Sequence, residues 1–425
     1  MNHTKPIAND WVAYVGPIDF PEGGAATRRV LGISQSLCDV GYRVTVVSGY
    51  LSANRAEGES VAVEPGIESV QVNERSAEHL PKWLRFARYF TMGRRSRSWF
   101  EQQSEWPKAI IIYSGYSPYL LSFTRWAKKR GIKIIFDAVE WYAAESWLGF
   151  ITSPYLMNTE FAMRYLIPKT DGVICISRAL QDYYDGRKVP TVRVPPTLSI
   201  LPKSTTETLG PFDSDNVALV KGDGPIRLVY AGTPGKKDRL DKIATAVKQL
   251  NSQQISDGLD RRQPALELHV VGMNEVDLIN YMRQSPESGV WDQQTLTTAG
   301  LVCHGQIPHA DVTKLLEQAH YTIFIREINR VSTFGFPTKY VESVAFGCPV
   351  ITNITTDLGQ FHHAKTGIVI PSTEVADIEA SLMHAMSLSE SQYYAQKEQA
   401  YQVAIKYFDV AQYAKPLKQF IQRLS

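Results

Sequence analysis

The sequence predicts an α/β protein built from two doubly wound, Rossmann-like parallel-sheet domains of about 200 residues each. Short runs rich in Val and Ile alternate with amphipathic helical patterns along most of the chain. The alternation stops over residues 186–225 and then restarts. With 425 residues, of which 44% are hydrophobic, the chain is long enough for two sizeable cores.

The first half contains six predicted strands, at residues 11–16, 43–50, 65–72, 109–115, 133–140 and 172–177. A helix follows the first strand, because Val30, Ile33, Leu37 and Val40 recur every three or four residues and Gly41 supplies a stop. A second helix covers residues 117–131. Strands separated by helices favour a parallel sheet that is covered on both faces.

The proline-rich stretch 186–225 predicts an interdomain linker followed by a loop. Beyond it the pattern gives strands at 226–232, 266–272, 300–305, 321–326, 348–353 and 367–371, with helices at 238–252, 309–319 and 338–347. The last segment is helical throughout. We therefore predict domains at 1–200 and 201–405, with a C-terminal helix at 406–425 that crosses back to the first domain.

Several function classes are disfavoured by composition. A formal net charge of +2 argues against nucleic acid as the partner. The four cysteines, Cys38, Cys175, Cys303 and Cys348, form no CxxC pair, so we expect buried reduced thiols. No run approaches the ~18–20 apolar residues of a membrane span, so we expect a cytoplasmic protein whose membrane contact, if any, is peripheral.

Three loops that follow strands carry candidate binding residues, because ligands of open parallel sheets bind beyond the carboxyl ends of the strands. The first holds Gly23 and Gly24 before a helix, where backbone can approach an anion; its spacing is not GxGxxG, and a plain flexible loop is the alternative. The second, AGTPGKKDRLD, follows Gly232 and places Lys236 and Lys237 before a helix whose expected N-cap is Asp238. These lysines suit a diphosphate, and a solvated pair is the alternative.

The third loop lies in the stretch IREINRVSTFGFPTKYVESVAFGCPVITN, residues 325–353. A strand is expected to end at Arg326, and a loop through Gly335, Phe336 and Pro337 leads into a helix starting near Thr338. Glu342, one turn into that helix, can accept two hydroxyl hydrogen bonds, as a ribose diol requires. The alternative is a surface Glu342 beside Lys339 on an amphipathic helix.

A basic and aromatic stretch, PKWLRFARYFTMGRRSRSWF at residues 81–100, has no acidic residue. Such a pattern is typical of a helix at an anionic membrane surface; the alternative is a core helix with a basic solvent face. The candidate membrane-contact residues are Arg85, Arg88, Arg94, Arg95 and Arg97.

From about residue 11 to 371 the chain resembles family 4-type glycosyltransferases of the two-domain GT-B fold, especially bacterial surface-polysaccharide enzymes. The ordered set of similar pieces is GGAATRRVLGISQSL, GYRVTVVS, FDAVEWY, VICISRAL, YAGTPGKKDRL, VVG, HGQIPHADVTKLLEQA and FPTKYVESVAFGCPVITN.

The resemblance implies a UDP- or GDP-sugar donor held mainly by the second domain, with the acceptor on the side of the first. Glu342 matches the ribose-binding glutamate, and Lys237 the lysine on the diphosphate, with Lys236 a second candidate and Arg326 sharing that role. Gly23 and Gly24 match the loop that closes on the donor. Glu140 in FDAVEWY matches an acidic position near the transferred sugar, with its neighbour Asp137 as the alternative.

One departure from the family pattern affects the sugar site. Many members carry a Glu eight residues before the ribose-binding one, and this chain has Phe334 there. The chain resembles a variant subgroup with a Gly-Phe-Pro-Thr-Lys turn, in which Thr338, Lys339 and loop amides substitute.

The resemblance also implies retaining sugar transfer. We expect no metal or other cofactor, because cations and helix N-termini can stabilise the charge of the leaving diphosphate. The only Asp-x-Asp spacing is Asp213–Asp215 in the expected linker, interpreted as a solvated loop. The expected acceptor is a glycan or a lipid-linked glycan in capsule, O-antigen or exopolysaccharide synthesis, at the inner face of the cell membrane. Two alternatives stay open: a sugar-nucleotide epimerase, marked by donor conversion without acceptor, and a non-catalytic nucleotide-sugar-binding subunit, marked by inactivity of the isolated protein.

Overall fold

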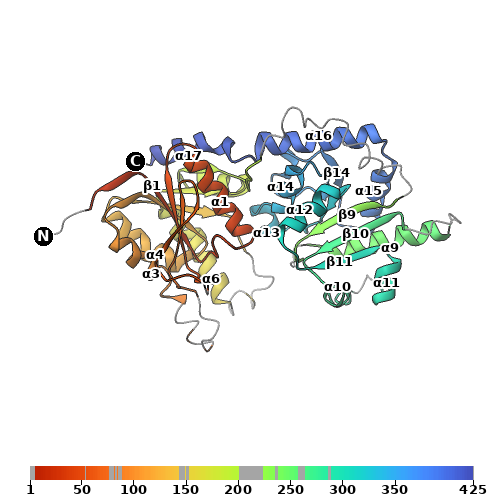
Figure 1. Cartoon of the computed structure of the whole chain (residues 1–425), viewed down its shortest axis with the longest axis horizontal. Coiled ribbons are helices and arrows are strands. Elements are labelled where there is room, and N and C mark those ends of the chain that lie inside the picture. Colours follow the sequence, from red (N-terminus) through yellow and green to blue (C-terminus); the bar gives the residue numbers. More distant parts are fainter. Residues whose placement is uncertain are drawn as a thin grey trace. The chain divides into compact units, whose positions relative to one another are not determined.

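The computed structural model divides the chain into two compact units, shown in Figure 1. The first comprises Met1–Ser199, Thr333–Phe336 and Phe408–Ser425, and the second Ile200–Ser332 and Pro337–Tyr407. The structure describes residues 5–52, 54–75, 81, 84, 89–142, 149, 153–200, 224–234, 238–256, 264–285 and 289–424.

The first unit is built on an eight-stranded sheet in the order β3-β4-β2-β1-β5-β6-β7-β8. All neighbouring strands are parallel except the β3–β4 hairpin at the edge. Its strands are β1 (Ile7–Gly16), β2 (Arg43–Ser48), β3 (Ser60–Glu64), β4 (Ile67–Gln71), β5 (Trp106–Tyr113), β6 (Lys133–Ala138), β7 (Gly172–Cys175) and β8 (Thr191–Arg193).

Helices cover this sheet: α1 (Ala25–Cys38), α3 (Arg94–Gln102), α4 (Tyr116–Lys128), α6 (Pro154–Phe161), α7 (Arg178–Asp185) and α17 (Ala411–Arg423). A π-helical turn, Ala162–Leu166, and a 3-10 turn, Ile167–Lys169, continue α6. The apolar stripe predicted on α1 is buried: Val30, Ile33 and Leu37 share one core with Leu417 and Phe420 of α17. Figure 1 shows α17 beside α1.

The second unit has a six-stranded parallel sheet in the order β11-β10-β9-β12-β13-β14, the doubly wound order with its switch point between β9 and β12. Its strands are β9 (Ile226–Ala231), β10 (Leu266–Val271), β11 (Leu301–Gly305), β12 (Tyr321–Ile323), β13 (Val350–Asn353) and β14 (Gly367–Ile370). Its helices are α9 (Leu240–Ser256), α10 (Glu275–Met282), α11 (Gln293–Thr298), α12 (His309–Gln318), α14 (Thr338–Ala345), α15 (Val375–Ser387) and α16 (Glu390–Tyr407); α13 (Arg330–Phe334) runs across the division between units.

The predicted fold class is thus confirmed, with two local corrections. The described part of the predicted linker contains β8, which pairs with β7 at the sheet edge; Pro190 before it and Pro195 after it leave its ladder intact, as prolines do at edges. The strand predicted at 321–326 ends at Ile323, because Arg326 pairs instead with Asp238 through an isolated β-bridge.

Candidate active site

The centre of the candidate site in the second unit is a buried carboxylate, Asp238, which lies between the end of β9 and the start of α9. Its side chain is 4% exposed and accepts three hydrogen bonds. The donors are Nε of Arg326 at 3.0 Å, Nζ of Lys339 at 3.2 Å and the hydroxyl of Tyr230 at 3.0 Å. These residues come from three separate loops and strands, so the fold brings together the second and third loops that the sequence singled out.

This cluster gathers two cations around one carboxylate. Burial raises the pKa of Asp238, but Lys339 and Arg326 outweigh burial and hold its pKa below the ordinary value, so the carboxylate is ionised. We call Tyr230, Asp238, Arg326 and Lys339 the cation cluster.

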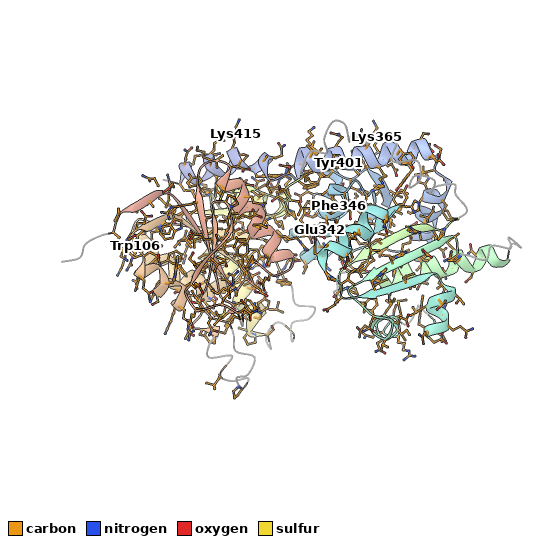
Figure 2. The ribbon with its side chains drawn as sticks, in the orientation of Figure 1. Trp106, Glu342, Phe346, Lys365, Tyr401 and Lys415 are labelled. Atoms are coloured by element: carbon orange, nitrogen blue, oxygen red, sulfur yellow. The ribbon has the colours of Figure 1, made fainter. Side chains whose placement is uncertain are left out.

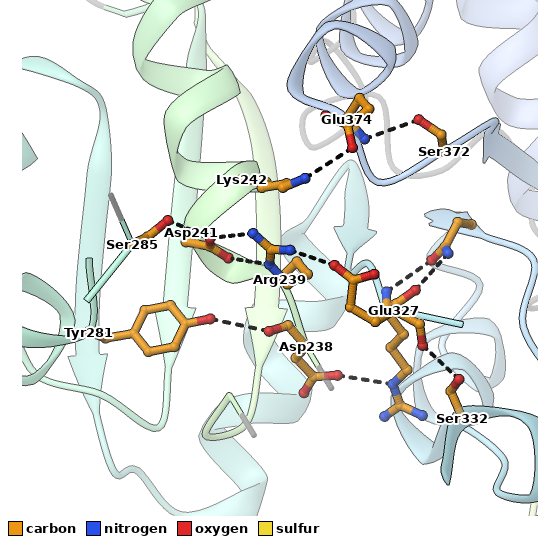
Figure 3. Close-up of polar contacts among 12 residues, drawn as sticks. Asp238, Arg239, Asp241, Lys242, Tyr281, Ser285, Glu327, Ser332, Ser372 and Glu374 are labelled. Atoms are coloured by element: carbon orange, nitrogen blue, oxygen red, sulfur yellow. Dashed lines mark hydrogen bonds and ion pairs between the residues drawn. The ribbon is translucent and has the colours of Figure 1, made fainter. Parts of the chain in front are cut away.

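The prediction that Asp238 caps the following helix is wrong. Helix α9 begins at Leu240, and the carboxylate of Asp238 is occupied by its three donors instead. Two cations reaching in from distant segments compete successfully for a carboxylate that needs compensation once buried. Figure 3 shows Asp238 beside a second network, in which Arg239 pairs with Asp241 at 2.9 Å and also with Glu327, so that one cation meets two carboxylates.

The backbone around the cation cluster is held in place by its neighbours. Asn353 at the end of β13 accepts from the Arg326 amide at 3.0 Å and donates to the Arg326 carbonyl at 2.8 Å. The Lys339 ammonium lies 3.7 Å from the Tyr230 ring centroid. Gly232 has φ +112°, and a Cβ there would come within 3.3 Å of Lys339 Cε. A glycine at the end of β9 therefore makes room for this lysine.

The start of α14 adds backbone donors beside Lys339. The helix begins at Thr338 after Pro337, and among the described residues no side chain caps its first amides and no acid lies in its first turn. Such an end attracts anions. Glu342 lies one turn further along the same helix and is half-buried (Figure 2). Gly335 and Phe336, the preceding loop residues, are buried and group with the first unit.

Some predicted donor residues fall outside the described part of the chain. These are Gly235, Lys236 and Lys237, together with the Asp213–Asp215 pair and the membrane candidates Arg85 and Arg88. Their roles stay predictions. Over the residues that the structure describes, no group of three or more His, Cys, Asp or Glu side chains is arranged to hold a metal ion. Within the same residues, no helix is long and apolar enough to cross a membrane.

In the first unit, Gly23 and Gly24 lie between β1 and α1 as predicted. Gly24 takes the N-cap position of α1, and no side chain of the described residues caps that end. The two glycines differ in their surroundings. A Cβ on Gly23 would lie 2.4 Å from the carbonyl oxygen of Asp19, whereas a Cβ on Gly24 would meet nothing within 4 Å. Gly23 is therefore required by the loop itself, and Gly24 leaves its backbone open to a ligand.

The two acidic candidates after β6 have different environments. Asp137 is fully buried, pairs with Arg29 at 2.6 Å and accepts a hydrogen bond from the Tyr14 hydroxyl at 2.5 Å. It is thus a structural counter-ion, and the alternative that it faces the sugar is wrong. Glu140 is half-buried and hydrogen-bonds with Tyr142, whose pKa is raised by burial first and by Glu140 second. Glu140 is the acid of this pair that stays a candidate.

Phe334, the residue at the usual glutamate position, lies in an aromatic cluster of the first unit. Its ring centroid is 5.1 Å from Trp141 and 6.5 Å from Tyr183, and its carbonyl accepts from Ser177 Oγ at 2.7 Å. An apolar ring thus occupies the position at which the family resemblance predicts a glutamate. The spacing of the motif revealed that Phe334 stands where a glutamate was expected. It could not indicate which residues Phe334 contacts, because they lie more than 150 residues away in the chain.

Comparisons with known proteins gave a family match for each half of the chain. A family model described as glycosyl transferase 4-like domain matches residues 24–197, and one described as glycosyl transferases group 1 matches residues 212–403. No curated protein matches the chain in sequence.

Similar solved structures include sucrose-phosphate synthase from Thermosynechococcus elongatus, with 14% identity, TM-score 0.65, and coverage of 98% of this chain and 99% of that one. WaaG, a glycosyltransferase involved in lipopolysaccharide biosynthesis, has 15% identity, TM-score 0.62, and coverage of 96% and 98%. Anabaena HepE in complex with UDP and glucose has 12% identity, TM-score 0.59, and coverage of 97% and 99%.

Proposed function

The chain is a glycosyltransferase of the GT-B fold, and we propose that it transfers a sugar from a UDP- or GDP-sugar to a glycan or lipid-linked acceptor. The cation cluster carries this proposal, because a nucleoside diphosphate is the leaving group of such a transfer and Arg326 and Lys339 bring two positive charges together near the start of α14. That HepE was solved with UDP and glucose supports the donor class.

The proposed mechanism follows the charge that develops during the transfer. The bond to the diphosphate breaks, the sugar gains oxocarbenium character and the diphosphate gains negative charge. Lys339, Arg326 and the first amides of α14 stabilise that charge, and their electrostatic contacts are strengthened because the Arg326 and Lys339 side chains are largely buried. Lys237, with Lys236, is the further phosphate ligand in this proposal.

The remaining roles orient the substrates. Glu342 accepts hydrogen bonds from the ribose hydroxyls, and Thr338 with the loop at Gly335–Pro337 contacts the donor. Gly24 offers its backbone to the donor phosphate, and Glu140 faces the transferred sugar. We further propose retention of the anomeric configuration, with a phosphate oxygen of the leaving group taking the proton of the acceptor hydroxyl, so that no metal is required.

Donor binding tests the proposal most directly. Calorimetry against a panel of UDP- and GDP-sugars should give one saturable binder, and Glu342→Ala and Lys237→Ala should each weaken it about 10-fold or more, as expected for a charged hydrogen bond worth ~1.5–3 kcal/mol. Glu317→Ala and Lys365→Ala, at exposed positions of the same unit, are matched controls that should bind like wild type. Near wild-type affinity in both test variants would overturn the site.

The proposed setting is polysaccharide synthesis, such as capsule, O-antigen or exopolysaccharide, at the inner face of the cell membrane. Release of nucleoside diphosphate that depends on an added acceptor would support transfer, whereas donor conversion without acceptor would indicate an epimerase. Peripheral membrane contact through Arg94, Arg95 and Arg97 predicts that changing all three to Glu abolishes binding to anionic vesicles, and unchanged binding would refute it.

A further inference from the structure

A groove of about 680 Å³ opens on the first unit between α3, α4 and α6, and nothing in the donor chemistry uses it. Its lining is mostly apolar and includes Phe90, Leu121, Met157 and Phe161. Helix α4 starts at Tyr116, just beyond the carboxyl end of β5 at Tyr113, and the groove is lined by the first half of this helix, including Ser117 and Leu121. The groove therefore lies on the side of the sheet where open α/β folds bind ligands.

The apolar side chains of this groove are unusually exposed. The exposed fraction is 60% for Phe90, 63% for Leu121, 47% for Met157 and 46% for Phe161. Single exposed apolar residues are ordinary on protein surfaces, but four that line one concavity form a contiguous patch, which marks a binding site. The patch needs an apolar occupant.

The charges beside the groove specify an anionic occupant. Arg94 and Arg97 are three residues apart on α3, share a helix face and both line the groove. Within the described residues neither forms an ion pair, and no acidic side chain lines the groove. Arg95, between them, instead pairs with Glu57 at 2.9 Å. Two guanidinium groups without an ion pair among the described residues, beside an apolar concavity, complement an amphiphile with a phosphate head.

Hydrogen bonds hold the walls of the groove together and connect it to a candidate site residue. Asn158 of α6 accepts from the Ser117 amide of α4 at 3.1 Å, and its amide donates to the Tyr89 hydroxyl. At the start of α6, the Tyr155 ring centroid lies 5.9 Å from that of Tyr142, which hydrogen-bonds with Glu140. These contacts hold the walls of the groove in place without a ligand, so the groove is preformed. It adjoins the segment that carries Glu140.

We propose that this groove holds the hydrocarbon chain of a lipid phosphate, whose phosphate lies on Arg94 and Arg97, and that this lipid is the carrier of the sugar acceptor. The inference rests on the proposed function, of which it names the acceptor class. According to this proposal, Arg94 and Arg97 of the basic stretch bind the lipid phosphate, and Arg95 does not.

The test is calorimetric binding of farnesyl phosphate, a short polyisoprenyl phosphate, below the concentration at which it forms micelles. Saturable binding to wild type is expected, with farnesol and inorganic phosphate each at least 10-fold weaker. Leu121→Glu and Met157→Glu should each weaken binding at least 10-fold, as should Arg94→Glu combined with Arg97→Glu. Arg95→Glu is the matched control and should bind within 2-fold of wild type.

Folding and donor binding are read separately in each variant by circular dichroism and by calorimetry with UDP. Both should be unchanged, because the altered side chains are at the surface of the first unit, so a failure of the groove is distinguishable from a failure of the donor site. Equal binding of farnesyl phosphate by wild type and Leu121→Glu would overturn the proposal. So would binding to anionic vesicles without binding of the monomeric lipid, which would indicate a bilayer-contact surface.

Discussion

Replacing Asp238 by Asn tests the cation cluster most sharply. The change removes the negative charge with which both Arg326 and Lys339 pair and keeps the size of the side chain. Removing one partner of a buried ion pair costs about 3 kcal/mol or more, because the remaining charge stays buried without compensation. For a unit of this size that corresponds to a decrease in Tm of roughly 6–12 °C.

The assay is thermal unfolding with and without UDP. A diphosphate supplies the negative charge that the variant lacks, so UDP should raise the Tm of Asp238→Asn by more degrees than it raises that of wild type at equal saturation. Asp311→Asn is the matched control: Asp311 pairs at 3.1 Å with an exposed Lys314, and surface pairs of this kind contribute little. Its Tm and its response to UDP should equal those of wild type.

The pH dependence of stability provides a second readout. Because the folded pKa of Asp238 lies below its ordinary value of 3.8, the carboxylate contributes its full stability above pH 3.8 and loses it as the pH falls through the folded pKa. Wild type and Asp238→Asn should therefore differ at neutral pH and converge only below about pH 3.8. Equal Tm values at neutral pH, or equal shifts with UDP, would refute the reasoning.

Three further predictions concern other groups. Burial lowers the pKa of His362 to about 4, so the unfolded chain binds an extra proton between about pH 6.5 and 4, and stability should fall by about 3 kcal/mol across that window. Denaturant unfolding at pH 7.5 and 4 should show a smaller fall in His362→Gln; an equal fall would contradict this assignment. Asp137→Ala leaves the Arg29 guanidinium buried without its counter-ion and should cost about 3 kcal/mol or more in the same measurement; a loss below about 1 kcal/mol would mean that the pair is not needed. Gly23→Ala should lower Tm because a backbone oxygen blocks its Cβ, whereas Gly24→Ala should keep the wild-type Tm and lower donor turnover; unchanged turnover would remove Gly24 from the donor site.

Much of the secondary structure and the positions of the loops could be predicted from the sequence, because both depend on local patterns. The stripe on α1 and the glycines before it are examples, as is the helix that carries Glu342. The buried ion pairs could not be predicted. Arg29 and Asp137 are 108 residues apart, and a charged side chain in a helical pattern gives no indication that it will be buried.

The local sequence pattern by itself determined that the chain forms two doubly wound halves, and it indicated which loops could bind an anion. Only the tertiary structure decided which charges meet: Asp238 became the counter-ion of Arg326 and Lys339 rather than a helix cap. It alone also assembled an apolar groove from three separated segments. The physical reason is that periodicity reports which face of an element is buried, whereas ion pairing and concavity depend on which distant segments the sheet order places side by side.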